Sequence, residues 1–108
     1  MKPVIWLGSS RDDIRGFPVE ARQEVGHELD RVQRGLEPSD WSPMPTVGSG
    51  VQEIRVHAEN EYRVFYVAKF SEVVYVLHAF AKKTPQTAKR DIELAADRYR
   101  QLLAQHRR

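Results

Sequence analysis

The fold is decided by three consecutive segments: VQEIRVH (residues 51–57), YRVFYVA (62–68) and VVYVLHAF (73–80). Each segment is short and rich in β-branched and aromatic residues, which predicts a β-strand. The polar turns at 58–60 and 70–72 separate them, so the stretch predicts a three-stranded antiparallel meander. The second and third segments are apolar at nearly every position, which predicts that both strands lie in the centre of the sheet.

Two amphipathic helices are expected, one before this meander in the sequence and one after it. Apolar residues at helical spacing predict one helix over residues 18–34, which begins at a proline and ends at Gly35, and another over 88–105 with Thr87 as its N-cap. The first apolar stripe is Val25, Leu29, Val32 and Leu36, and the second is Ala88, Ile92, Ala95, Tyr99 and Leu102.

The remaining segments complete the predicted architecture. The apolar run at 4–7 predicts an edge strand, and residues 11–16 are compatible with a helical turn. Residues 37–50 contain three prolines and two glycines and are expected to form a loop. The chain is therefore predicted to be one α+β domain over residues 1–108, a small twisted antiparallel sheet with packed helices in the order β-α-β-β-β-α.

Composition excludes several classes of function. The chain has 108 residues, 41% of them hydrophobic, which suits one globular domain. The absence of cysteine excludes disulfides, thiolate nucleophiles and cysteine-based zinc sites. The four histidines lie far apart and no nucleotide-binding or hydrolase motif is present, so neither a metal nor a cofactor is expected. No apolar stretch is long enough for a membrane span and no signal peptide is apparent, which favours a cytoplasmic protein.

Charge is distributed unevenly along the chain. Residues 1–80 carry 9 basic and 12 acidic side chains, whereas residues 81–108 carry 8 basic and 3 acidic ones. A basic segment on a near-neutral body favours a polyanionic partner such as nucleic acid, and Lys89, Arg90 and Arg98 are candidate contacts to RNA. The alternative is a helix whose lysines and arginines simply face solvent.

The candidate catalytic residues are cations on or just after the predicted strands. Arg63 lies within an apolar strand, where a charge needs either a partner, such as Glu53 or Glu61, or a function. Lys82 and Lys83 follow the last apolar strand and are read either as charges that protect a strand end or as ligands for phosphate.

Two further residues have both a structural and a catalytic interpretation. Arg55 has Glu53 as a ready partner on its own strand face, and His78 is read either as a core histidine or as a proton carrier. Converging cations would suit cleavage of RNA by its own 2′-hydroxyl, which needs alignment, charge stabilisation and proton transfer but no protein nucleophile.

Several motifs together resemble RelE/HigB-type toxins of bacterial type II toxin–antitoxin systems, with the phage-derived HigB-like branch as the nearest pattern. They are GVQEIRV (50–56), YRVFY (62–66) and VLHAFAKKT (76–84), extended by QRG (33–35) and KRDIELA (89–95). The resemblance implies a RelE/ParE-like fold and a metal-independent, ribosome-dependent mRNA endoribonuclease. It also implies ribosome and mRNA as partners, together with a cognate antitoxin of helix-turn-helix type.

The resemblance also implies roles for individual residues. It casts Arg63 as a stabiliser of the scissile phosphate, Lys82 and Lys83 as a basic pair at the phosphate or leaving oxygen, and Arg55 as structural or catalytic. His78 is a further candidate. No tyrosine follows the lysine pair as in some relatives, so proton transfer falls to Tyr99 or His78. Two alternatives stay open: a ParE-like, non-catalytic poison of a topoisomerase, and an accessory protein that only binds RNA or a partner.

Overall fold

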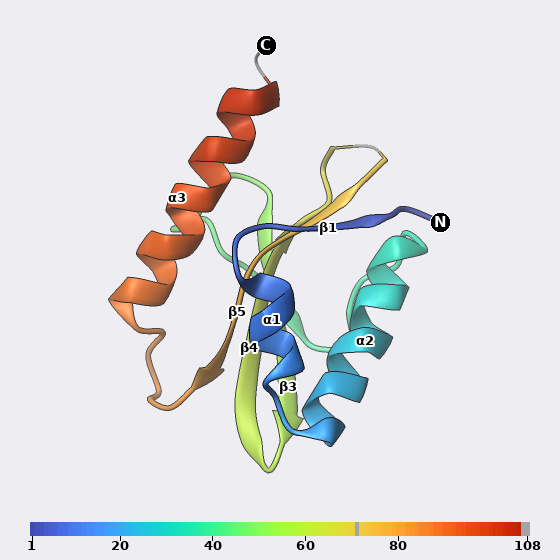
Figure 1. Cartoon of the computed structure of the whole chain (residues 1–108), viewed down its shortest axis with the longest axis vertical. Coiled ribbons are helices and arrows are strands. Elements are labelled where there is room, and N and C mark those ends of the chain that lie inside the picture. Colours follow the sequence, from blue (N-terminus) through green and yellow to red (C-terminus); the bar gives the residue numbers. More distant parts are fainter. Residues whose placement is uncertain (71, 107–108) are drawn as a thin grey trace.

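The computed structural model describes residues 1–70 and 72–106, which form a five-stranded sheet with helices on both faces (Figure 1). The elements are β1 (Val4–Trp6), α1 (Ser10–Arg15), α2 (Val19–Gln33), β2 (Trp41–Pro43), β3 (Val51–Ala58), β4 (Asn60–Val67), β5 (Val74–Lys82) and α3 (Lys89–His106). The strand order is β1-β5-β4-β3-β2. The predicted meander is confirmed as β3, β4 and β5, with β4 and β5 both inside the sheet. The predicted turn at 70–72 includes Ser71, which lies outside the described residues.

The edges of the sheet differ from the prediction. The expected loop at 37–50 contains β2, which pairs antiparallel with Gln52–Ile54 of β3. Proline is tolerated there because an edge strand has one side without ladder hydrogen bonds. The predicted first strand is confirmed at the other edge, but β1 pairs parallel with β5, so the sheet is mixed rather than wholly antiparallel. The order of elements is therefore β-α-α-β-β-β-β-α, because the turn at 11–16 is also a helix, α1.

Each face of the sheet carries its own hydrophobic core. Alternate residues of a strand point to opposite faces, so Ile54, Val64 and Val76 pack beneath α1 and α2. On the opposite face, Phe65, Leu77 and Phe80 pack against Ala95, Tyr99 and Leu102 of α3. In Figure 1, α3 lies to one side of the strands, α2 lies to the other, and α1 crosses in front of them.

Three local expectations are corrected. Leu36 is exposed because α2 ends at Gln33 and the chain reverses at Gly35, whose φ is +82°. Glu28, which lies outside the predicted apolar stripe of this helix, is nevertheless buried, and its Oε2 accepts a hydrogen bond from the Ser39 amide. Helix α3 is entered from Ala88 rather than Thr87, since the Ala88 carbonyl accepts the first helical bonds. Among the described residues, no helix combines the length and apolarity that crossing a bilayer requires.

Candidate functional site

Two adjoining cavities lie at the end of β5 and along the segment that connects it to α3. Strand β5 continues to Lys82, two residues beyond the predicted end, and Lys82, Lys83 and Thr84 line both cavities. One cavity, of about 350 Å³, is completed by Glu61, Arg63 and Pro85. The other, of about 230 Å³, is completed by Phe80, Ala81, Gln86, Ala88, Arg90 and Asp91. We call the two together the basic cavities.

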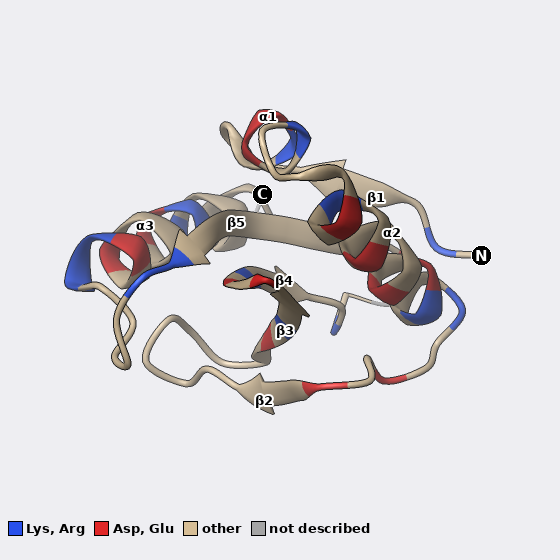
Figure 2. Ribbon diagram, turned by 90° about the horizontal axis from the view of Figure 1, so that it is seen from below, with Lys and Arg blue, Asp and Glu red and all other residues tan. Residues whose placement is uncertain are grey.

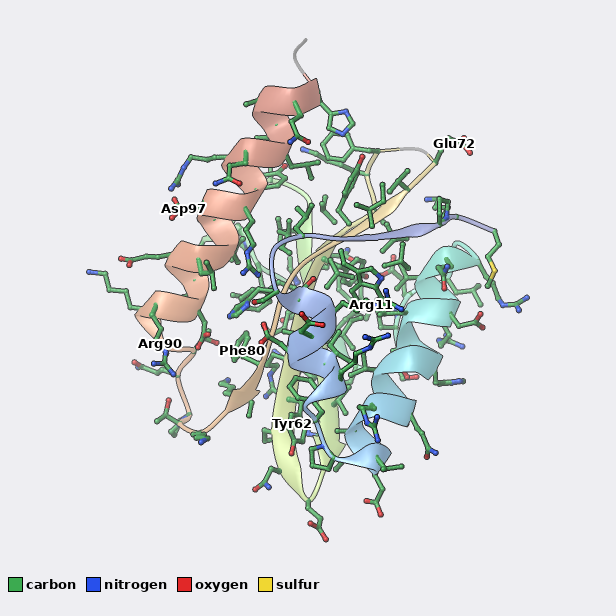
Figure 3. The ribbon with its side chains drawn as sticks, viewed as in Figure 1. Arg11, Tyr62, Glu72, Phe80, Arg90 and Asp97 are labelled. Carbon is green, nitrogen blue, oxygen red and sulfur yellow. The ribbon has the colours of Figure 1, made fainter. Side chains whose placement is uncertain are left out.

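Three of the four cations that line the basic cavities have no ion-pair partner among the described residues. Within residues 1–70 and 72–106, Lys82, Lys83 and Arg90 form no ion pair. Figure 2 shows the basic end of β5 beside the basic start of α3, and Figure 3 labels Arg90 at that start. Lys89, the next predicted RNA contact, is highly exposed and lies 3.7 Å from Glu93. Free cations around a hollow favour a phosphate-bearing ligand.

Arg63 is buried at the wall of the larger cavity. Its Nε lies 2.7 Å from Glu53 Oε1, an ion pair whose angle does not suit a hydrogen bond, and its Nη1 donates to Glu61 and to the Tyr62 carbonyl. Arg63 therefore contacts both of its predicted partners, Glu53 and Glu61. Arg63 lines the larger cavity, and its Nη2 has no hydrogen-bond partner among the described residues.

Arg55 is held in place by neighbours on β2 and β3. Its Nη2 donates to Ser42 Oγ at 3.1 Å, its Nη1 lies 3.5 Å from Asp40 Oδ1, and its Nε lies 3.8 Å from Glu53 Oε1. Arg55 and Arg63 are directly opposite in the antiparallel register. The two arginines share Glu53, which offsets their mutual repulsion.

His57 is a site residue that the sequence analysis missed. Its Nε2 lies 2.7 Å from Asp40 Oδ2 and its Nδ1 lies 2.7 Å from Glu61 Oε2. Hydrogen bonds to Asp40 and Glu61 raise the pKa of His57, and the bond to His57 is the main cause that lowers the pKa of each carboxyl. The available signal was the HAENE hairpin: His57 and Glu61 are directly opposite, around Glu59 with a φ of 65°.

These acidic and imidazole groups are not arranged for a metal. Each ring nitrogen of His57 already faces a carboxylate. In the part of the chain that the structure describes, no group of three or more His, Cys, Asp or Glu side chains could hold a metal ion.

His78 is a core histidine that joins β5 to α3. Its Nε2 lies 2.7 Å from Asp91 Oδ1 in the first turn of α3, and both side chains are mostly buried. The ring stacks on Phe80 at a centroid distance of 5.1 Å and meets Phe65 edge-on. Its Nδ1 is buried without a hydrogen-bond partner. Of this His78–Asp91 pair, only Asp91 lines a basic cavity, the smaller one.

Arg98 is occupied by partners within the protein. Its Nη1 donates to the Leu77 carbonyl at 2.8 Å and its Nη2 donates to Ser9 Oγ at 3.2 Å. The guanidinium lies over Gly8, where a Cβ atom would come within 2.4 Å of it. Arg98 therefore fastens α3 to β5 and to the segment that follows β1.

A family model described as "Phage derived protein Gp49-like (DUF891)" matches residues 12–100 of the 108. The chain belongs to the Gp49-like family. The Gp49-like match extends from α1 into α3 and includes both basic cavities and all eight predicted site residues. The Gp49-like family is associated with toxin–antitoxin systems. No curated protein matches the sequence.

Proposed function

We propose that this Gp49-like protein is the toxin of a toxin–antitoxin pair and cleaves mRNA on the ribosome without a metal ion, as a RelE/HigB-type endoribonuclease. The observation that carries the proposal is a set of three cations, Lys82, Lys83 and Arg90, that have no ion-pair partner in the described part of the chain and surround two adjoining cavities with Arg63 at the wall. A ribosomal substrate implies action in the bacterial cytoplasm, where growth would be inhibited by loss of translation.

The proposed reaction uses the RNA as its own nucleophile. A 2′-hydroxyl attacks the adjacent phosphorus, and negative charge grows on the phosphoryl oxygens in the transition state. The lysine ammonium groups and Arg63 Nη2 would stabilise that charge at any physiological pH. Because Glu53 and Glu61 already orient Arg63, little reorganisation is needed when the phosphate arrives.

A cognate antitoxin is the expected second partner. The cations that attract RNA would equally attract an acidic segment, so an antitoxin that covers the basic cavities would block substrate entry. The resemblance implies that this antitoxin is of the helix-turn-helix type.

The test is primer extension on a defined mRNA in a reconstituted translation reaction, with and without ribosomes. The informative variant is Lys82→Gln/Lys83→Gln, which is expected to abolish ribosome-dependent cuts while the protein stays folded. The matched control, Arg11→Gln/Arg22→Gln, removes the same charge from α1 and α2, away from Arg90 on α3 (Figure 3). It is expected to cut like the wild type.

Two results would count against the proposal. Intact mRNA with a folded, growth-inhibiting protein would transfer the assignment to the ParE-like alternative, which inhibits a topoisomerase without catalysis. Equal cutting by the lysine variant and the control would remove Lys82 and Lys83 from the site.

A further inference from the structure

The larger basic cavity contains one acidic side chain among its cations. Glu61 lines it together with Arg63, Lys82 and Lys83, and it stands directly opposite Lys82 in the β4–β5 register. The Glu61 side chain is 43% exposed, so a ligand in the cavity can reach it. Both carboxylate oxygens are also held: Oε1 by Arg63 Nη1 at 3.1 Å and Oε2 by His57 Nδ1 at 2.7 Å. A carboxylate fixed inside a phosphate-binding hollow needs an explanation.

Attack by a 2′-hydroxyl requires a group that accepts its proton. The protonated lysines and arginines of the basic cavities cannot accept one. His78 is buried, with its Nε2 engaged by Asp91 and its Nδ1 enclosed, and Asp91 is itself largely buried by that pairing. The Tyr99 hydroxyl donates to the Ser49 carbonyl and lines neither cavity. Glu61 is thus the exposed acceptor within the cavity.

We propose that Glu61 is the general base of the cleavage reaction and that His57, backed by Asp40, is the residue that positions it. This inference rests on the proposed nuclease function. The Glu61 carboxylate takes the proton of the 2′-hydroxyl while the 2′-oxygen forms its bond to phosphorus. The bond from phosphorus to the 5′-oxygen breaks, and that oxygen leaves with its electron pair and takes a proton from a lysine ammonium. The products are a 2′,3′-cyclic phosphate and a 5′-hydroxyl, and the proton on Glu61 returns to the lysine through water.

The positioning role of His57 follows from its two hydrogen bonds. Asp40 fixes one side of the ring through Nε2 and Glu61 meets the other side through Nδ1, each at 2.7 Å. Because Asp40 and Glu61 each hold one nitrogen of the His57 ring, the ring is fixed in place. The Glu61 carboxylate that it binds therefore cannot rotate freely. The hydrogen bond from His57 and that from Arg63 also keep the Glu61 carboxyl ionised, as its lowered pKa indicates. An ionised, oriented carboxylate is ready to accept a proton at neutral pH.

The experiment measures single-turnover cleavage of a synthetic mRNA bound to ribosomes. The variant Glu61→Gln preserves shape and removes the base, so cleavage is expected to slow by about 10²–10⁴-fold. Binding to ribosomes carrying mRNA with a 2′-deoxy residue at the cut site is expected to stay unchanged. The variant rate should rise about tenfold per pH unit as hydroxide replaces the missing base, whereas the wild-type rate should not.

A second substrate separates the base from the acid. In mRNA with a bridging sulfur at the 5′ position of the scissile phosphate, the leaving group needs no proton. Loss of the general base should slow cleavage of this substrate as much as cleavage of the natural one. If Glu61→Gln instead cuts the sulfur-containing substrate at the wild-type rate, Glu61 is the general acid and its assignment as the base is overturned. Wild-type cutting with an undiminished Glu61→Gln rate would overturn the inference alone, whereas an inactive wild type would overturn the nuclease proposal and the inference together.

His57 is tested by a pair of variants. Asparagine can place an amide N–H near the position of Nδ1, so His57→Asn should retain more activity than His57→Ala. The urea midpoints of both proteins control for folding. If the two variants lose activity equally while their midpoints stay at the wild-type value, His57 does not position the base.

Discussion

Replacement of Arg63 by methionine removes the cation from an almost fully buried ion pair. Arg63 Nε lies 2.7 Å from Glu53 Oε1, and the two side chains are 7% and 5% exposed. Removing one partner of such a pair costs up to about 3–5 kcal/mol, because Glu53 stays buried and keeps only Arg55, whose Nε lies 3.8 Å from Glu53 Oε1. A domain of this size is stable by about 5–15 kcal/mol. The Tm of Arg63→Met is therefore expected to fall by about 10–20 °C.

The assay is urea unfolding of the wild type, Arg63→Met, Glu53→Leu and the double variant. The double variant should recover most of the lost stability, because replacing a buried pair by apolar side chains is often close to neutral. A loss below about 1 kcal/mol in Arg63→Met would show that water reaches Glu53 and would refute the buried-pair reasoning. The outcome also decides which variant can test catalysis: Arg63→Lys keeps a charge for Glu53 and removes Nη2, whereas an uncharged substitution confounds activity with folding.

Three further predictions concern stability and ligand binding. The substitutions Gly48→Ala and Gly26→Ala should change the urea midpoint in opposite directions. The new Cβ at Gly48 would lie 2.0 Å from the Tyr99 ring and lower the free energy of unfolding by about 1–3 kcal/mol. Gly26 in α2 has open space around it, so alanine there should raise the free energy of unfolding by about 0.5–1 kcal/mol. The pKa of His57 is raised, so the stability that His57 contributes is fully present below its ordinary pKa of 6.5 and is lost as pH rises through the raised value. The pKa values of Asp40 and Glu61 are lowered from 3.8 and 4.5, so the stability that these carboxyls contribute is present above those values and is lost as pH falls through the lowered ones. Urea midpoints from pH 3 to 9 should show both losses in the wild type, whereas His57→Gln should lack the alkaline loss and show a smaller acid loss, because His57 is the main cause of both lowered carboxyl pKa values. Parallel profiles would contradict the cluster. Arg98→Leu should lower the melting temperature with little change in the salt-dependent affinity for RNA, and Arg90→Leu should do the reverse. Equal affinity losses would support the prediction that Arg98 contacts RNA.

The parts of the fold that sequence analysis predicted are those that local chemistry determines. The apolar, β-branched segments became β3, β4 and β5, and the apolar stripe over 18–34 became α2 within one residue at each end. The pairing of β2 was missed because a three-residue strand ending at Pro43 has no periodicity to detect. It forms because β3 offers an open edge, where the Asp40 carbonyl accepts a hydrogen bond from the Arg55 amide.

The candidate site was predicted only as far as residue identity. The sequence alone determined that Arg63, Lys82 and Lys83 are the unusual cations, because charges in or beside apolar strands stand out without knowledge of the fold. It named Glu61 only as a possible ion-pair partner of Arg63 and left His57 unremarked, because Asp40 and His57 are separated by 16 intervening residues and meet only when β2, β3 and β4 take their register.

The tertiary structure decided which charges are available. Arg63 and Arg98 are engaged by groups from other elements, whereas Lys82, Lys83 and Arg90 face two cavities without a counter-ion in the described part of the chain. An ion pair depends on a distance of a few ångströms, and strand register and helix docking set that distance. Composition and spacing could therefore identify the cations, but only packing could separate those that hold the fold together from those left to bind a ligand.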